Sequence, residues 1–208
     1  MPGFDATPTL TGELVELIPL SPDLVPGLVE AADVDRSTYG FTEVPATEEA
    51  MVDYMGRLLA KRDAGTDVPF AQRLARSGRV VGCTRFLELR RWRGRGEPDE
   101  VEIGGTWLAG DVQRSGVNAE AKLLLLTHAF DTWGVGRVAL CTDADNERSR
   151  TAIEHIGAQF EGILRKHRPS MVAGNEGRPR HTALFAIIDE EWPDVRTRLT
   201  TRLRASRT

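Results

Sequence analysis

Hydrophobic and polar positions alternate in the first half of the chain in a way that predicts strands and helices. The expected elements are strands at 10–20, 69–76 and 79–89, and helices that begin at Ser21 and Thr47. Ser21 and Pro22 are typical of a helix start, because serine caps the first turn and proline fits the first helical position. Ser77-Gly78 predicts a two-residue turn that joins the last two strands into a hairpin.

The second half of the chain predicts strands and helices that alternate before two final strands and a last helix. The expected strands lie at 101–108, 137–142, 159–166 and 182–188, and the expected helices at 117–133, at 146–156 and from 189 onward. The leucine run 123–126 is apolar on nearly every side of its helix, which predicts a buried helix. Gly157 is typical of a helix end. This order of elements predicts an α+β or mixed α/β fold.

Length and charge narrow the class of protein. The chain has 208 residues, 40% of them hydrophobic, and a net charge of −4, which argues against a general nucleic-acid binder. We expect a flexible tail at 1–8, one domain at 9–195, and an arginine-rich C-terminal helix or tail at 196–208. No apolar run approaches the ~20 residues that span a bilayer. The start of the chain also lacks the pattern of a secretory signal, so we expect a cytoplasmic protein.

Cysteine and histidine positions give no metal or disulfide pattern. Cys83 and Cys141 lie singly in apolar, strand-like runs, which predicts buried thiols that behave as small hydrophobic residues. The four histidines include no His-x-x-x-His pair. We therefore expect no bound metal.

A glycine-containing loop at 113–118 opens the helix expected at 117. The first amides of a helix have free N–H groups, and the helix dipole adds positive potential there. Gly116 allows close approach to the backbone, and Arg114 adds a positive charge, so the loop fits a pyrophosphate. Ordinary capping of a core helix explains the same residues equally well.

Two sequence blocks resemble the GNAT superfamily of acyl-CoA-dependent N-acetyltransferases, in its RimJ/RimL-like branch of ribosomal-protein N-terminal acetyltransferases. The run Gln113-Arg114-Ser115-Gly116-Val117-Asn118 stands where the family has its pyrophosphate loop, Gln/Arg-x-x-Gly-x-Gly/Ala. Asn146-Glu147-Arg148-Ser149, followed by Gly157, matches a second family block. The chain departs from the family at Asn118, which replaces a small residue, and at Ile153, where many members carry a tyrosine that protonates the leaving thiolate.

The resemblance implies a mostly antiparallel, twisted central sheet that is splayed at the coenzyme A site and flanked by helices. It also implies direct acetyl transfer, in a ternary complex, from acetyl-CoA to a primary amine, either a protein N-terminus or a small molecule. A homodimer is common in the resembled branch. Two alternatives stay open, namely a non-catalytic acyl-CoA-binding module and a transferase for another acyl-CoA such as succinyl-CoA. The residues implied for coenzyme A binding are Trp107, Leu108, Gln113, Arg114, Ser115, Gly116, Val117, Asn118, Ala119, Asn146 and Ser149.

Two residues are candidates for proton transfer. Glu102 lies eleven residues before Gln113, which is the spacing of the base glutamate in histone-acetylating members of the resembled family. An outward-facing strand carboxylate is the alternative for Glu102. Ser149 is, by resemblance, a proton donor or a hydrogen-bond partner of the thiol, and the alternative is a helix residue that bonds locally.

Candidate acceptor residues lie in two regions. Tyr39, Phe41 and Glu43 follow the first helix, in a region that shapes the acceptor cleft of the resembled family. Basic residues near the far end of the sheet fit either an acidic substrate or a solvated face; they are Arg165, Lys166, His167, Arg180 and His181. A further arginine-rich run at 85–95 has acidic neighbours, which is typical of a mixed surface.

Overall fold

In the part of the chain that the structure describes, eight strands form one sheet in the order β1-β2-β3-β4-β5-β6-β8-β7, and β5–β6 is the one parallel pair there. The strands are β1 (Leu10–Thr11), β2 (Val15–Pro19), β3 (Val68–Leu74), β4 (Val80–Arg90), β5 (Glu100–Leu108), β6 (Arg137–Asp143), β7 (Gln159–Pro169) and β8 (Pro179–Ile188). The computed structural model describes residues 7–172 and 174–205, so most of the expected tail at 1–8 lies outside the described residues. The predicted α+β class, with a mostly antiparallel sheet, is confirmed.

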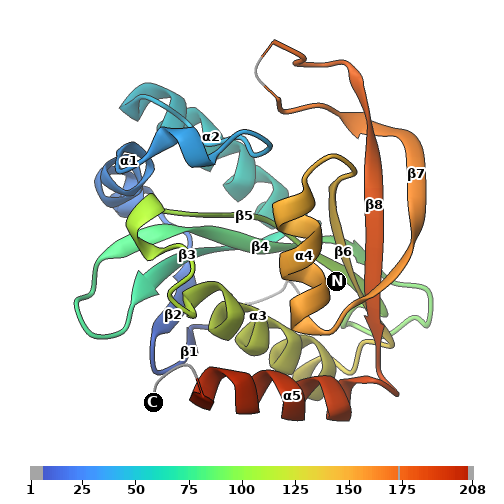
Figure 1. Ribbon diagram of the computed structural model, residues 1–208. Coiled ribbons are helices and arrows are strands. Elements are labelled where there is room, and N and C mark those ends of the chain that lie inside the picture. Colours follow the sequence, from blue (N-terminus) through green and yellow to red (C-terminus); the bar gives the residue numbers. More distant parts are fainter. Residues whose placement is uncertain (1–6, 173, 206–208) are drawn as a thin grey trace.

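Helices cover both faces of this sheet (Figure 1). The helices are α1 (Val25–Asp33), α2 (Glu48–Asp63), α3 (Val117–Thr127), α4 (Glu147–Ile156) and α5 (Trp192–Ala205), and a π-helical turn (His128–Thr132) follows α3. In the view of Figure 1, α1 and α2 lie above the sheet, α3 and α5 lie below it, and α4 lies beside β6. None of the helices in the described part of the chain has the length and apolar content needed to span a membrane.

The two faces of the sheet are separated by the alternation of side chains along β4. Phe86 packs on Trp133, after α3, with ring centroids 4.6 Å apart. Its neighbour Leu87 therefore points to the opposite face, the one covered by α2, and pairs in register with Glu102 of β5. Glu102 thus lies on the α2 side of the sheet.

Two of the predicted helix boundaries hold at their capping residues, whereas the Ser21 side chain makes no cap bond and a 3-10 turn (Pro22–Leu24) precedes α1. Thr47 caps α2 by accepting a hydrogen bond from the N–H of Ala50 (3.2 Å). Gly157 ends α4 with a φ of 108°. The helix predicted at 117–133 instead ends as an α-helix at Thr127 and continues as the π-helical turn.

Two further expectations differ from the structure. The β3–β4 turn spans residues 75–79 rather than two residues, because β3 already ends at Leu74, whose N–H donates to the Arg79 carbonyl (2.9 Å). The boundary expected after residue 195 falls inside α5. Leu199 and Leu203 of this helix are 2% and 5% exposed, so its arginine-rich half packs on the core.

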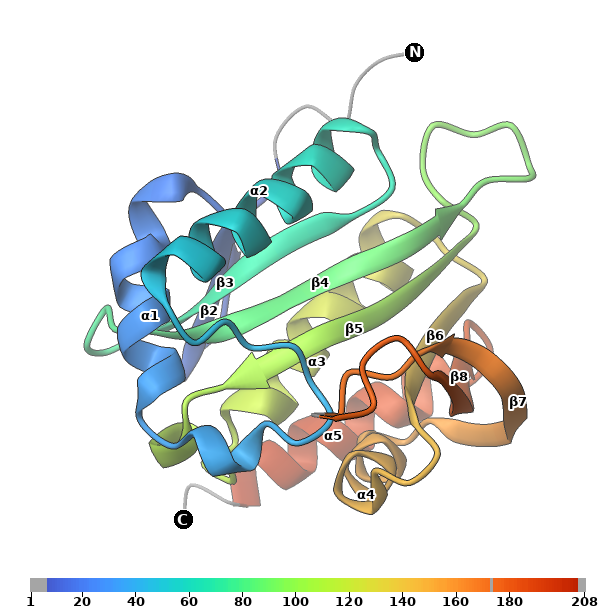
Figure 2. The same ribbon diagram turned by 90° about the horizontal axis from the view of Figure 1, so that it is seen from above.

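The sheet opens between β5 and β6. These strands pair only from Glu100 to Glu102 on β5, and beyond Glu102 strand β5 pairs with β4 alone. A bulge near Gly105, whose φ is 56°, bends β5 within this unpaired stretch. Figure 2 shows the two strands running apart, with the α1–α2 segment crossing in front of the end of β5.

Candidate active site

The loop after β5 has the backbone of an anion-binding turn. Arg114 and Gly116 have left-handed φ values of 63° and 89°, and α3 begins at the next residue, Val117. A loop in which left-handed residues alternate with ordinary ones turns successive N–H groups to one side of the chain. The first amides of α3 have no acceptor within the helix. The loop predicted at 113–118 therefore exists, and pyrophosphate binding there stays a prediction.

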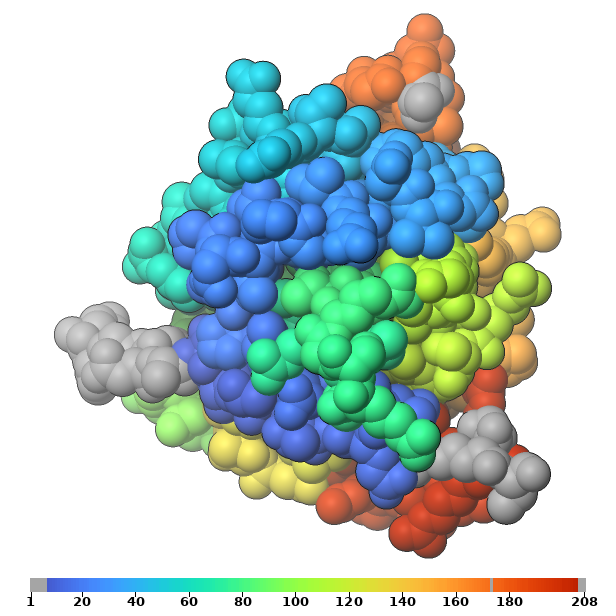
Figure 3. Space-filling view, turned by 90° about the vertical axis from the view of Figure 1, so that its left-hand side faces the viewer, coloured from blue at the N-terminus to red at the C-terminus, as the bar shows by residue number. Residues whose placement is uncertain are grey.

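Side-chain hydrogen bonds tie this loop to two other segments. Gln113 donates through Nε2 to the Leu108 carbonyl (3.1 Å) and to Thr38 Oγ1 (3.0 Å). Arg148, from the first turn of α4, donates to Gln113 Oε1 (3.2 Å) and to the Thr38 carbonyl (2.7 Å). In Figure 3 the yellow-green loop after β5 lies beside the light blue α1–α2 segment. Arg148 was not predicted, because nothing in sequence places it near Thr38.

The predicted acceptor residues divide into two groups. Tyr39 donates through its hydroxyl to the Leu108 carbonyl (3.1 Å), and its ring meets that of Trp107 edge-on at 6.1 Å. Burial raises the pKa of Tyr39. Phe41 is half-buried, whereas Glu43 is exposed and pairs with Arg57 of α2. Tyr39 therefore lies at the opening of the sheet, and Glu43 is engaged elsewhere.

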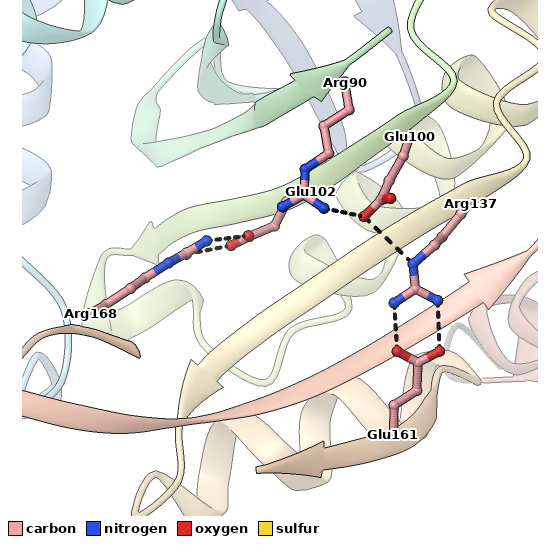
Figure 4. Close-up of polar contacts among 6 residues, drawn as sticks. All are labelled: Arg90, Glu100, Glu102, Arg137, Glu161 and Arg168. Carbon is pink, nitrogen blue, oxygen red and sulfur yellow. Dashed lines mark hydrogen bonds and ion pairs between the residues drawn. The ribbon is translucent and has the colours of Figure 1, made fainter. Parts of the chain in front are cut away.

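Glu102 lies at the point where β5 and β6 separate, and it forms a buried ion pair (Figure 4). Its side chain is 7% exposed, which rules out the outward-facing alternative. Arg168 of β7 donates to both carboxylate oxygens, at 2.8 Å and 2.6 Å. Hydrogen bonding to Glu102 raises the pKa of Arg168. Arg168 was not predicted, because the two residues are far apart in sequence and only the β7–β8 pairing brings Arg168 to this place.

Three more polar groups surround this pair. Arg180 lies directly opposite Arg168 in the β7–β8 register, and its Nη1 is 4.0 Å from Asp143 Oδ2 at the end of β6. Burial raises the pKa of the Cys141 thiol to about 12, and the charge of Glu102 acts in the same direction. We call Glu102, Cys141, Asp143, Arg168 and Arg180 the inner cluster.

The start of α4 carries the second predicted block. Asn146 is the N-cap, and its Oδ1 accepts a hydrogen bond from the N–H of Ser149 (3.0 Å). The Ser149 hydroxyl has no hydrogen-bond partner among the described residues, so the side chain does not bond locally there. Ile153 is buried in the core and offers no proton.

A second charged group lies farther along the same face of the sheet, on the side away from the opening. Arg137 bonds both carboxylate oxygens of Glu161 and lies 3.5 Å from Glu100, which in turn lies 3.3 Å from Arg90 (Figure 4). We call these four residues the outer ladder. Because they belong to β4, β5, β6 and β7, their ion pairs link four strands. The arginine-rich run at 85–95 is neutralised in a similar way, since Arg85 pairs with Asp67.

A buried lysine lies under the bulge of β5, on the α3 side. Lys122 donates to Thr106 Oγ1 (2.6 Å) and Thr84 Oγ1 (3.2 Å). Burial lowers the pKa of Lys122 to about 7. The signal in sequence is one lysine next to the leucine run 123–126. Among the described residues, no cluster of histidine, cysteine and carboxylate groups could hold a metal ion.

The opened sheet, with a glycine loop at the start of the following helix, defines the acyl-CoA N-acyltransferase class of fold. The chain belongs to the GNAT acetyltransferase family, because the model of the Acetyltransferase (GNAT) domain matches residues 15–159. This finding confirms the predicted superfamily.

Similar proteins agree with this assignment. A protein named as the ribosomal N-acetyltransferase YdaF of Bacillus subtilis is 31% identical over 93 residues, which are 45% of this chain. That match spans about half of the relative's length, 48%. A GCN5-related N-acetyltransferase from Brucella melitensis is 27% identical over 95% of this chain and 86% of its own, with a TM-score of 0.80. A structure named as an acetyltransferase from T. thermophilus is 32% identical over 95% of this chain and 98% of its own, with a TM-score of 0.78.

Proposed function

We propose that this protein is an acetyl-CoA-dependent N-acetyltransferase that transfers an acetyl group to a primary amine by direct attack in a ternary complex. The observation that carries this proposal is the loop 113–118, which opens α3 directly after the strand that separates from its neighbour. Enzymes of the GNAT acetyltransferase family use acetyl-CoA. The proposal assigns the opening between β5 and β6 to the cosubstrate.

The residues around the opening fit this cosubstrate. The amides of 115–119 would bind the pyrophosphate, with Arg114 as an added positive charge, because they lie at the start of α3. The backbone of Trp107 and Leu108 lies on β5 where β6 has left, so it would hold the pantetheine. Asn146 and Ser149 of α4 would contact the thiol end. When bound, acetyl-CoA supplies the thioester carbonyl, and N–H donors aimed at such an oxygen are worth about 3 kcal/mol each.

Glu102 is the proposed acceptor of the amine proton, directly or through a water. A carboxylate has about four lone pairs. Arg168 uses two of those on Glu102, which leaves lone pairs for the incoming ammonium or a water. Arg168 holds the carboxylate in one orientation. A positioned base of this kind contributes about 10²- to 10⁴-fold in rate.

Ser149 is the proposed donor of a proton or hydrogen bond to the departing thiolate. Its hydroxyl is available, and it starts the helix turn above Ile153, which replaces the usual family tyrosine. The cap bond from Asn146 fixes the backbone at Ser149 (3.0 Å).

Two acceptor classes fit the opening, a protein N-terminal amine and a small-molecule amine. The name of the relative YdaF, a ribosomal N-acetyltransferase, favours a protein acceptor. An α-amine has a pKa near 8 and gives up its proton more readily than an alkyl amine with a pKa near 10. The homodimer implied by the RimJ/RimL-like branch stays a prediction.

A thiol-release assay tests this function. The protein is mixed with acetyl-CoA and with either peptides that have free N-termini or small amines, and calorimetry measures coenzyme A binding in parallel. Release of thiol with one acceptor class is the expected result. Coenzyme A binding without thiol release, with both acetyl-CoA and succinyl-CoA as donors, would overturn the proposed enzyme activity and favour a binding module.

A further inference from the structure

Arg180 is a mostly buried arginine whose side chain makes one long ion pair and leaves its Nε without a partner among the described residues. Its side chain is 14% exposed, and its Nε is buried without a hydrogen-bond partner. Within the described part of the chain it donates no hydrogen bond, and its one ion-pair contact is the 4.0 Å approach to Asp143. A guanidinium has five N–H donors, and burying polar donors without acceptors is costly. Arg180 therefore lies in its present environment at a cost that an oxygen-rich ligand would relieve.

The neighbours of Arg180 do not supply this ligand. Asp143 Oδ1 accepts a hydrogen bond from the N–H of Asp145 (3.1 Å), so this carboxylate is partly engaged in its own turn. Arg168 bonds both oxygens of Glu102, and among the described residues no hydrogen bond joins Glu102 to Arg180. Burial lowers the pKa of Arg180, Asp143 opposes this change, and the positive charge of Arg168 reinforces it. The two arginines thus face each other across β7 and β8; two hydrogen bonds hold Arg168, whereas Arg180 has only the 4.0 Å ion pair with Asp143 among the described residues.

The position of Arg180 links it to the reaction. It belongs to the inner cluster around Glu102, which is the last residue of β5 that pairs with β6. The cluster therefore lies at the opening where an acyl group and an amine would meet. By contrast, Arg165 on the same hairpin is exposed, as expected for a solvated face.

We propose that Arg180 binds a carboxylate of one of the two substrates, so that the enzyme prefers a substrate with a carboxylate close to its reacting group. The carboxylate belongs either to the acceptor, as in an amino acid or a short acidic amine, or to the acyl chain of a dicarboxylic acyl-CoA. In both cases the N–H groups of Arg180 pair with the two oxygens of the anion. This inference rests on the proposed acyltransferase function.

The test compares three substrate pairs in the thiol-release assay. The first is acetyl-CoA with glycine, the second acetyl-CoA with glycinamide, and the third succinyl-CoA with glycinamide. A higher kcat/KM for the first pair than for the second identifies the acceptor as the source of the carboxylate. A higher value for the third pair than for the second identifies the acyl chain.

Variants assign this preference to Arg180. Arg180→Met is expected to lower kcat/KM for the preferred carboxylate substrate by about 10- to 100-fold, mainly through KM, and to leave the uncharged pair nearly unchanged. Arg180→Lys should recover part of the loss, because it keeps the charge but loses the two-pronged geometry. Arg165→Met is the matched control and should behave as wild type. Turnover without a carboxylate preference, or a preference that survives in Arg180→Met, would overturn the inference.

A binding readout separates this inference from the proposed function. Calorimetry with N-acetylglycine and succinate as probes is expected to give binding that is lost in Arg180→Met and kept in Arg165→Met. If the protein binds these probes but releases no thiol with any of the three substrate pairs, the proposed enzyme function is wrong and the anion site at Arg180 is still supported. Absence of both probe binding and substrate preference would overturn the anion site.

Discussion

The inner cluster and the outer ladder share one face of the sheet, begin two residues apart on β5, and are built from the same types of residue (Figure 4). In the outer ladder Arg137 bonds Glu161 and Glu100, and Glu100 also meets Arg90. In the inner cluster Glu102 is nearly buried, and Arg180 has no hydrogen-bond partner among the described residues. Residues that only join strands satisfy one another. Residues that leave donors unused and lie at an opening are suited to a ligand.

The largest expected effect extends this comparison to Lys122, a buried amine that pairs with no carboxylate among the described residues. Its pKa is about 7 in the folded protein against an ordinary 10.5, so between these values the unfolded chain holds the proton and the folded chain does not. Stability therefore rises with pH across this window. From pH 7 to 9.5 the wild type should gain about 3 kcal/mol relative to Lys122→Met.

Urea unfolding of both proteins at these two pH values measures this gain. Equal slopes of stability against pH in the two proteins would show that Lys122 keeps its proton when folded. Lys61→Met, at an exposed position near the end of α2, is the control and should follow the wild type.

The second prediction separates the two groups by stability. Arg168→Met leaves Glu102 buried without its partner, and we expect a loss of about 3 kcal/mol. Arg137→Met leaves Glu100 with Arg90, and Glu161 can turn to solvent, so we expect about 1 kcal/mol. Chemical denaturation measures both. Equal losses of stability in the two variants would mean that the ion pair of Glu102 in the inner cluster matters no more for stability than the ion pairs of the outer ladder.

The smallest effect concerns Ser149. Ser149→Ala removes one hydroxyl and should lower kcat about 10-fold, with a smaller change in the Kd for coenzyme A. Ser170→Ala, a buried serine of the β7–β8 loop, is a control for loss of a hydroxyl elsewhere. Unchanged kcat in Ser149→Ala would remove the side chain from the mechanism.

Local signals in the sequence predicted most of the fold. Thr47, Asn146 and Gly157 mark helix ends by their own chemistry, and the structure keeps all three boundaries. The β3–β4 turn was predicted too short, because Ser77-Gly78 marks a turn but does not fix how far the ladder continues. The π-helical turn after Thr127 begins at His128, whose ring packs on Trp133 (4.6 Å), and a helical period does not reveal such a turn.

The candidate site could be predicted only where its residues are close together in the sequence. The loop 113–118 and the cap at Asn146 are contiguous in sequence, and both have the expected form. Glu102 was identified by its spacing from the loop, but its pairing with Arg168 depends on the register of distant strands. The same register makes Arg180 half-buried, although its sequence context is that of a solvated face.

The pH dependence of kcat in Glu102→Gln, with Glu100→Gln as the matched variant from the outer ladder, tests the central claim most directly. The inner cluster is the reaction site in this account, so Glu102→Gln should lower kcat by about 10²- to 10³-fold at pH 7 and should recover as the pH rises towards the pKa of the amine. Glu100→Gln should stay within about twofold of wild type at every pH. A wild-type rate and pH profile in Glu102→Gln, or equal losses in both variants, would contradict the account.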